Sequence, residues 1–234
     1  MNIALLGYGR MGRSIETIAL NRNHTISLKA SSKTTDFDFS NTDVAIDFSL
    51  PSTAVSNIKR ALAAGIPVIS GTTGWLNQYD EVLDYCISKN GTFLYASNFS
   101  LGVNIFFEIN KRLIQLMAGF TEYSTEIEEI HHTQKLDAPS GTAISLAEQI
   151  ISNSNYTNWT LDTPKPNEIK IDAKRVEGVP GTHEIIFNSE IDAISIKHTA
   201  HSRQGFAMGA VIAAEWIKDK KGIYTMKDVL NINI

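Results

Sequence analysis

The sequence predicts an α/β fold, in which a doubly wound parallel sheet is followed by a second, α+β domain built on a mostly antiparallel open sheet. Up to about residue 100, short apolar runs alternate with amphipathic helical stretches. This alternation is typical of βαβ units with helices on both faces of a parallel sheet. Beyond that point several strand-like runs follow one another, two of them through a short polar connection, which favours antiparallel pairing.

The elements of the first part are set by apolar runs and helix signals. The expected strands are residues 3–6, 24–30, 43–48, 66–70 and 91–96. The expected helices are residues 11–21, 52–64 and 75–89. The second of these helices has Ser52 as an N-cap and Gly65 as a C-terminal stop.

The second part has a different order of elements. The expected helices are residues 101–117, 142–152 and 206–218, and the expected strands are residues 125–130, 169–175, 183–187 and 193–198. The polar stretch at residues 153–168 is expected to be a loop, and a short tail follows the last helix.

The composition excludes several classes of protein. With 234 residues, 43% of them hydrophobic, the chain can bury a substantial core. A net charge of −4 without a basic stripe argues against nucleic-acid or membrane-surface binding. No apolar run approaches the roughly 20 residues that cross a bilayer, and the first residues do not resemble a signal peptide. A single cysteine, Cys86, precludes a disulfide within the chain, so we expect a cytoplasmic protein.

A glycine-rich turn follows the first expected strand. Gly7, Gly9 and Gly12 form the pattern G-x-G-x-x-G and lead into a helix, with Arg10 and Met11 between them. The first glycine permits a tight turn, the second lets a pyrophosphate approach the backbone, and the third lets helix and strand pack closely. The helix N-terminus adds unpaired N–H groups that bind phosphates. This context predicts a Rossmann-type site for NADPH, NADH or both.

The end of the second strand bears on the choice of cofactor. NAD sites place an acid there and NADP sites a cation, but residues 29–33 contain no acid. Lys33, aided by the hydroxyls of Ser31 and Ser32, and Arg10 are candidates for binding a 2′-phosphate. We therefore expect NADPH to be used at least as well as NADH; a solvated surface lysine is the alternative interpretation of Lys33.

Two further strand ends carry small and polar residues. Gly71, Thr72 and Thr73 follow one buried strand, and Asn98 and Phe99 follow the next. Ligands of doubly wound sheets bind at the carboxyl ends of strands, so these residues are candidates for lining a nicotinamide ring. An ordinary capped surface turn is the alternative.

The densest chemistry lies between a strand and a helix, in the run HHTQKLDAPSGT. The run contains three side chains that can donate protons or bind negatively charged groups: His131, His132 and Lys135. Ser140, Gly141 and Thr142 lie at a helix start, where hydroxyls and backbone N–H groups bind carboxylates. Together they predict a site for a small carboxylic acid that needs protonation.

Other interpretations of this run remain open. A polar loop that caps a helix would look similar, and Asp137 suits a turn. A metal site is not expected, because adjacent residues on an extended chain point in opposite directions and no Cys pair or H-E-x-x-H spacing is present.

At these residues the sequence resembles the dihydrodipicolinate reductase family, whose signature is a glutamate-rich strand followed by H-H-x-x-K-x-D-A-P-S-G-T-A. Here it is complete as EIEEIHHTQKLDAPSGTA. Further matches are GRMG, DFS, GTTG and NFSLGVN in the first part, and R-x-x-G-x-x-G-x-H from Arg175, H-x-A-x-S-R from His198 and F-A-x-G-A from Phe206 in the second. Residues 153–168 show no clear match.

The resemblance implies NAD(P)H-dependent reduction of 4-hydroxy-tetrahydrodipicolinate, with loss of water, to tetrahydrodipicolinate in the diaminopimelate route of lysine biosynthesis. It implies His131 as general acid, with Lys135 sharing this role. His132 and Lys135 would hold the substrate dicarboxylate. It implies that a substrate carboxylate is bound by Ser140, Gly141 and Thr142. It also implies that the nicotinamide is lined by Gly71, Thr73, Asn98 and Phe99.

It also implies a domain division and an assembly. Residues 1–102 and 205–234 would form the dinucleotide-binding domain. Residues 103–204 would form the domain that binds substrate and assembles a homotetramer through its sheet. The sequence departs from the family pattern at two places that concern the choice of cofactor and the strength of its binding. The glycine turn is one residue shorter than in many members, and the acid often found after the second strand is absent.

Two other functions compete with this one. A different Rossmann oxidoreductase, such as an amino-acid or semialdehyde dehydrogenase, would be separated by a substrate screen. A dinucleotide-binding sensor would bind NADPH without turnover.

Overall fold

A computed structural model describes residues 1–31, 33–202 and 204–232. The chain forms two compact units, Met1–Asn104 with Gln204–Ile234, and Ile105–Arg203. Among the described residues, no helix is both long and apolar enough to cross a membrane.

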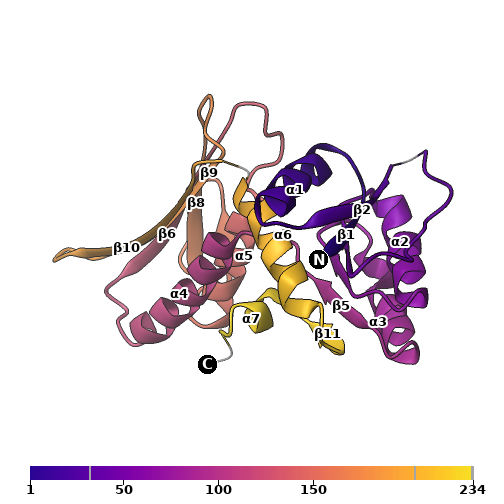
Figure 1. Cartoon of the computed structure of the whole chain (residues 1–234). Helices are drawn as coiled ribbons and strands as arrows, with labels where there is room; N and C mark the ends of the chain where they lie inside the picture. Colours follow the sequence, from indigo (N-terminus) through magenta and orange to yellow (C-terminus); the bar gives the residue numbers. More distant parts are fainter. Residues whose placement is uncertain (32, 203, 233–234) are drawn as a thin grey trace. The chain divides into compact units, whose positions relative to one another are not determined.

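The first unit is built on a sheet of six parallel strands in the order β11-β5-β4-β3-β1-β2 (Figure 1). The strands are β1 (Asn2–Leu6), β2 (Thr25–Ala30), β3 (Val44–Asp47), β4 (Val68–Ser70), β5 (Thr92–Tyr95) and β11 (Gly222–Tyr224). The helices are α1 (Arg10–Asn21), α2 (Pro51–Ala63), the 3-10 turn η1 (Leu76–Gln78), α3 (Tyr79–Ser88), α6 (Gln204–Ile217) and the short α7 (Met226–Val229).

Both faces of this sheet are covered, as its continuous apolar strands require. In β1, Ile3 and Leu5 pack in the cluster that contains the buried residues of α1 and α6. Ala4 and Leu6 point the other way, into the cluster formed with α2 and α3. Side chains of a strand alternate between faces, so one short apolar run supplies both cores.

The second unit contains a mixed sheet in the order β10-β9-β6-β8-β7. Its strands are β6 (Ser124–His131), β7 (Asn158–Thr160), β8 (Glu168–Arg175), β9 (Gly181–Asn188) and β10 (Ala193–Ala200). Helices α4 (Leu101–Met117) and α5 (Gly141–Ser152) pack on one face, in a core that includes Phe106, Ile114 and Leu146 (Figure 1). Two strand pairs are antiparallel and two are parallel.

The predicted fold class is confirmed, with more parallel pairing in the second sheet than the sequence indicated. Three short elements lie where only loop or tail was expected: β7 within residues 153–168, and β11 and α7 in the tail. The expected helix at residues 75–89 begins with η1 before it continues as α3.

Candidate active site

The three glycines of the first turn have different surroundings. Gly7 has a φ of +104°, which glycine adopts without strain. A Cβ at Gly7 would lie 2.1 Å from the Phe48 carbonyl oxygen, and one at Gly12 would lie 2.3 Å from the Gly7 oxygen. A Cβ at Gly9 would meet no protein atom within 4 Å. Packing therefore requires the first and third glycines, whereas the second faces open space at the start of α1, as expected where a pyrophosphate approaches the backbone.

The remaining residues of the turn contribute mainly backbone groups. The Met11 side chain packs against the core, and the Arg10 side chain is exposed. Both lie in the first turn of α1, where N–H groups have no partner within the helix. A cavity of about 580 Å³ adjoins this turn and is lined by Gly7, Gly9, the end of β2 and one side of α2. Its volume is in the range of small-molecule sites.

A buried carboxylate organises the carboxyl ends of β3 and β4. Asp47 accepts hydrogen bonds from the hydroxyls of Ser49 (2.6 Å), Thr72 (2.7 Å) and Ser70 (2.8 Å), and from the Asn57 amide (3.5 Å). Burial raises the pKa of Asp47, and these bonds oppose that rise.

The Thr72 hydroxyl also accepts from the Ser49 backbone N–H at 2.8 Å. This hydroxyl is therefore used within the protein, while Thr73 beside it is exposed. The Phe48 ring lies over Gly71, where a Cβ would come within 2.3 Å of it.

Asn98 and Phe99 follow β5 at the same edge of the sheet. The Asn98 side chain accepts from the Ser100 N–H at 2.8 Å and so shapes the turn into α4. The Phe99 ring is buried, 5.7 Å from the ring of Phe48. The predicted cofactor residues near Gly7, Gly71 and Asn98 thus all lie at the carboxyl edge of the first sheet, and so does Lys33, which is exposed in the loop after β2.

The second unit holds the predicted proton-donating group. His131 ends β6 and is buried, with its ring 5.0 Å from that of His183 and its Nδ1 atom 3.4 Å from the Glu129 carboxylate. A Cβ at Gly181 would lie 3.1 Å from His131 Nε2, so this glycine gives the ring room. Burial and the neighbouring His183 lower the pKa of His131 to about 4, against the opposing effect of Glu129.

Glu129 lies at the centre of this cluster. Its side chain is fully buried, and both carboxylate oxygens accept from the Ser140 N–H at 3.1 Å. Arg175 approaches it at 3.4 Å and His183 at 3.7 Å. Burial raises the pKa of Glu129, but the neighbouring His183 and the hydrogen bond from the Ser140 N–H outweigh burial and lower it to about 2.

Three ligand atoms of Glu129, His131 and His183 lie within 4.8 Å of one another, a spacing compatible with a metal ion. Glu129 is, however, already engaged by a backbone N–H and an arginine, and this positive charge opposes a cation. The trio is better described as a buried cluster of a carboxylate and two imidazoles.

The carboxylate cradle was predicted at the start of α5. Ser140 is the N-cap and its hydroxyl accepts from the Ala143 N–H. The Ser140 N–H is taken by Glu129, so the N–H groups of Gly141 and Thr142 are the ones that the first turn presents. A Cβ at Gly141 would meet no atom within 4 Å, which leaves space for a ligand. Pro139 precedes the cap and follows a cis peptide bond.

The loop between His131 and Ser140 is held by cations. Lys135 Nζ contacts both Asp137 carboxylate oxygens, at 2.7 and 2.9 Å, and this contact lowers the pKa of Asp137. Arg175 donates to the Asp137 carbonyl at 2.7 Å. His132 is half-buried next to these groups in the chain.

The sequence did not predict roles for Glu129, Arg175, Gly181 or His183. Arg175, Gly181 and His183 were noted only as members of a motif, and the strand register pairs Arg175 with His131 and His183 with Glu129. A signal for Glu129 was available: with Thr125, Ile127 and His131 it occupies alternate positions of one strand, on the buried face. Arg203 and Ser32 lie outside the described residues.

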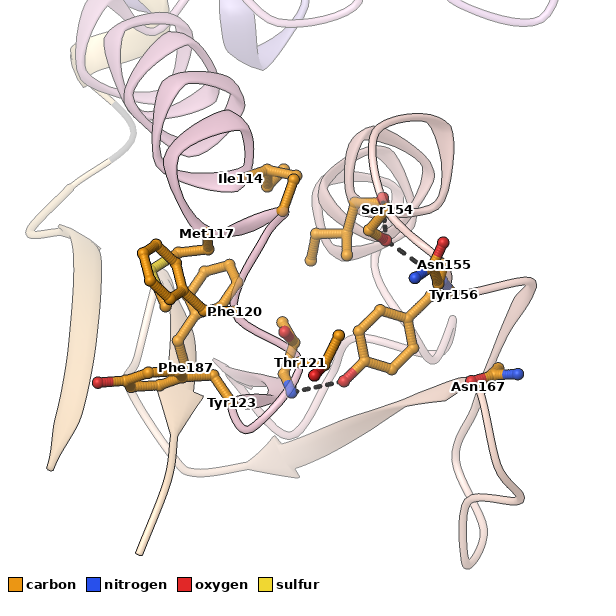
Figure 2. Close-up of a pocket in the computed structure, with 13 residues that line it drawn as sticks. Ile114, Met117, Phe120, Thr121, Tyr123, Ser154, Asn155, Tyr156, Asn167 and Phe187 are labelled. Atoms are coloured by element: carbon orange, nitrogen blue, oxygen red, sulfur yellow. Dashed lines mark hydrogen bonds between the residues drawn. The ribbon is translucent and has the colours of Figure 1, made fainter. Parts of the chain in front are cut away.

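Another cavity, of about 210 Å³, lies at the opposite end of β6 (Figure 2). The Tyr156 side chain lines this cavity, and its hydroxyl accepts a hydrogen bond from the Thr125 N–H at 2.7 Å. Its described lining includes no carboxylate, lysine, arginine or histidine. Because Thr125 is six residues from His131, the two sites are about 20 Å apart along the strand, so this cavity is separate from the His131 cluster.

Comparison with known proteins decides the family. The family described as "Dihydrodipicolinate reductase, N-terminus" matches residues 1–99, and "Dihydrodipicolinate reductase, C-terminus" matches residues 102–230. The chain belongs to the dihydrodipicolinate reductase family. The predictions of this family and of an oxidoreductase are confirmed.

Individual dihydrodipicolinate reductase relatives agree. A 4-hydroxy-tetrahydrodipicolinate reductase from Christiangramia forsetii is 56% identical over 99% of this chain and 98% of its own length. One from Methanococcoides burtonii is 41% identical over 82% of this chain and 74% of its own. The dipicolinate-bound dihydrodipicolinate reductase from Paenisporosarcina sp. TG-14 matches the fold with a TM-score of 0.76 and 21% identity, over 96% of this chain and 97% of that one. The family is one of pyridine-nucleotide-dependent reductases, so the cofactor is confirmed at that level.

Proposed function

We propose that this chain reduces 4-hydroxy-tetrahydrodipicolinate, through the cyclic imine dicarboxylate left after loss of water, to tetrahydrodipicolinate. The observation that carries the proposal is the buried His131 beside Glu129, on the strand that leads through the Lys135 loop to the open N-terminus of α5. The family relatives are named for this activity. The overall change adds one hydride and one proton to the ring.

The residues of the second unit would bind and protonate the substrate. The N–H groups of Gly141 and Thr142, with the Ser140 hydroxyl, would hold one carboxylate at the helix N-terminus. Lys135 would exchange its contact with Asp137 for a substrate carboxylate, and His132 would assist in binding. When bound, the reduced nicotinamide supplies the hydride.

His131 would donate the proton. With a pKa of about 4 it is neutral at pH 7 in the free protein. Two substrate carboxylates would favour its protonated form, because opposite charge within a few ångströms raises a histidine pKa. The proton would then enter with the substrate and be lost to it during reduction. Glu129 lies 3.4 Å from the Nδ1 atom of this ring and would stabilise its protonated form.

The residues of the first unit would hold the cofactor. Gly7, Gly9 and Gly12, with the N–H groups of Arg10 and Met11, would bind the pyrophosphate. Gly71, Thr72, Thr73, Asn98 and Phe99 would line the nicotinamide, Thr72 through its backbone. We propose that NADPH serves at least as well as NADH, since no acid follows β2 before Asp36, and Lys33 is a candidate for the 2′-phosphate.

We further propose a cytoplasmic homotetramer that assembles through the second sheet. Helices cover one face of that sheet, and its other face presents Glu126, Glu128, Glu184 and Ile186, each exposed or half-buried. Multi-angle light scattering would give the mass of the assembly, and a monomeric mass at micromolar concentration would contradict the proposal.

The test of the activity is cofactor oxidation with freshly generated 4-hydroxy-tetrahydrodipicolinate. We expect turnover with the natural chain, and a loss of about 10²–10⁴-fold in kcat for His131→Gln, since general acid catalysis contributes that much. NADPH affinity should stay unchanged. His24→Gln, a histidine of the first unit paired with Glu215, is the matched control. A loss within about threefold for His131→Gln would exclude the acid role.

A further inference from the structure

The cavity beside the glycine turn has a charged side chain in the part of its lining that the structure describes. Among its described lining residues only Arg60, on α2, carries a charge at neutral pH. Ser31 and Thr34 from the loop after β2 and Thr53 and Ser56 from α2 supply hydroxyls. Sites that prefer a free ribose 2′-hydroxyl place an acid at the end of the second strand, but this lining is cationic and rich in hydroxyls. It therefore suits an additional phosphate.

The Arg60 guanidinium is held in place without being neutralised. Its central carbon lies 4.6 Å from the centre of the Phe37 ring, which also lines the cavity. Stacking on an aromatic face leaves the N–H groups at the edge of the guanidinium free to bind a planar or tetrahedral anion. No ion pair joins Arg60 to an acid within the described parts of the chain, although Asp36 lines an adjacent hollow with it.

The other candidate cations are less well placed. Lys33 and Arg10 are exposed, and neither lines the described part of the cavity. After β2, the Ser31 N–H donates to the Thr34 hydroxyl at 2.9 Å and the Lys33 N–H donates to the Ser31 hydroxyl at 3.3 Å. Ser31 and Thr34 thus line the same cavity as Arg60 on α2.

We propose that Arg60, stacked on Phe37, binds the 2′-phosphate of the cofactor and sets the preference for NADPH over NADH. The inference rests on the proposed function, because it assumes that the cavity holds the adenosine half of the cofactor. It assigns specificity to α2 in place of the loop after β2.

Calorimetric titration with two cofactor fragments tests the proposal without turnover. Adenosine 2′,5′-bisphosphate carries the 2′-phosphate, and adenosine 5′-monophosphate lacks it. We expect Arg60→Ala to weaken binding of the bisphosphate about tenfold or more, as for loss of a charge-assisted hydrogen bond, and binding of the monophosphate less than twofold. Arg60→Lys should give an intermediate loss of affinity for the bisphosphate, since lysine keeps the charge but lacks the planar pair of N–H donors of a guanidinium.

Lys59→Ala is the matched control. It removes the same charge from the same helix, but Lys59 pairs with Glu81 and does not line the cavity. Lys59→Ala should bind both fragments as the natural chain does. In titrations with the whole cofactors, Arg60→Ala should weaken binding of NADPH more than binding of NADH, and Lys59→Ala should weaken neither.

The possible outcomes separate the two proposals. An equal loss of both fragments in Arg60→Ala would overturn the inference, since Arg60 would then contact the adenine or shape the cavity. A loss of bisphosphate preference in Lys33→Ala and not in Arg60→Ala would also overturn it. If the natural chain bound neither the fragments nor either dinucleotide, the proposed cofactor site itself would fail.

Discussion

Gly9 and Gly12 differ in what a methyl group would meet. At Gly12 it would lie 2.3 Å from the Gly7 carbonyl oxygen, whereas at Gly9 it would point into open space. The backbone at Gly9 has φ −89°, which alanine also adopts. The same substitution should therefore affect binding at one position and folding at the other.

We predict that Gly9→Ala keeps the melting temperature within about 2 °C and weakens NADPH binding about tenfold or more, because a methyl group would displace the pyrophosphate. Gly12→Ala should lower the melting temperature by several degrees, since overpacking costs roughly 1–3 kcal/mol. Thermal unfolding and NADPH titration of both variants measure this. Equal effects on stability would contradict the assignment of Gly9 to the ligand.

The low pKa of His131 leads to a second prediction. The free protein holds His131 neutral above about pH 4, so binding of the substrate dicarboxylate or a planar dicarboxylate inhibitor near pH 6 should take up close to one proton. The dependence of the calorimetric binding enthalpy on buffer ionisation measures this uptake. His131→Gln should abolish it; unchanged uptake in that variant would assign the proton to another group.

On the scale of elements, Asp47 connects the ends of two strands and the helix that follows one of them. It binds Ser49 after β3, Ser70 and Thr72 at β4 and Asn57 in α2. Ser70, Thr72 and Asn57 are buried, and an unsatisfied buried donor costs about 1–3 kcal/mol.

We predict that Asp47→Ala lowers the free energy of unfolding by about 3 kcal/mol or more, measured by chemical denaturation. Nicotinamide binding should weaken as well, because the loop with Thr72 and Thr73 loses its anchor. Asp38→Ala, an exposed aspartate that accepts from the Ser40 N–H, is the control and should change stability by less than about 0.5 kcal/mol. A similarly small effect at Asp47 would show that the cluster is not required.

The same scale shows how far the sequence could predict the structure. Strands with long apolar runs and helices with caps were predicted because each carries its own periodic signal. β7 and β11 have three residues each and α7 has four, too few for a period to be recognised. The parallel pairing of β8 with β6 is a property of the sheet and not of either strand's pattern.

The candidate site divides in the same way. The residues from His131 to Thr142 are contiguous, so their chemistry was visible in the sequence. Arg175 and His183 reach Glu129 from other strands. Only the strand register brings them together, and no local pattern encodes it.

On the scale of the whole molecule, the buried cluster makes stability depend on pH. The pKa of His131 is lowered from 6.5 to about 4, so the unfolded chain binds a proton that the folded chain excludes between these values. The stabilisation is present above pH 6.5 and is lost as the pH falls towards 4. Glu129, lowered from 4.5 to about 2, adds a loss that begins below pH 4.5.

We therefore predict that the free energy of unfolding decreases as the pH falls from 7 to 4, as measured by denaturant titrations across this range. Replacing His131 by glutamine should flatten the dependence between pH 6.5 and 4. A slope that is the same in both proteins would show that other groups cause it.

The placement of α6 has a consequence for synthesis of the protein. Its buried residues, including Ala207, Ala210, Val211 and Ile217, complete one of the two cores of the first sheet, and β11 forms an edge of that sheet. The chain emerges from the ribosome from its N-terminus. The first sheet therefore lacks α6 and β11 while residues 105–203 are synthesised. The second unit is continuous in sequence and can fold first. Nascent chains arrested so that only residues 1–203 have emerged should thus be protected from protease in the second unit and cleaved in the first; protection of both units would contradict this order.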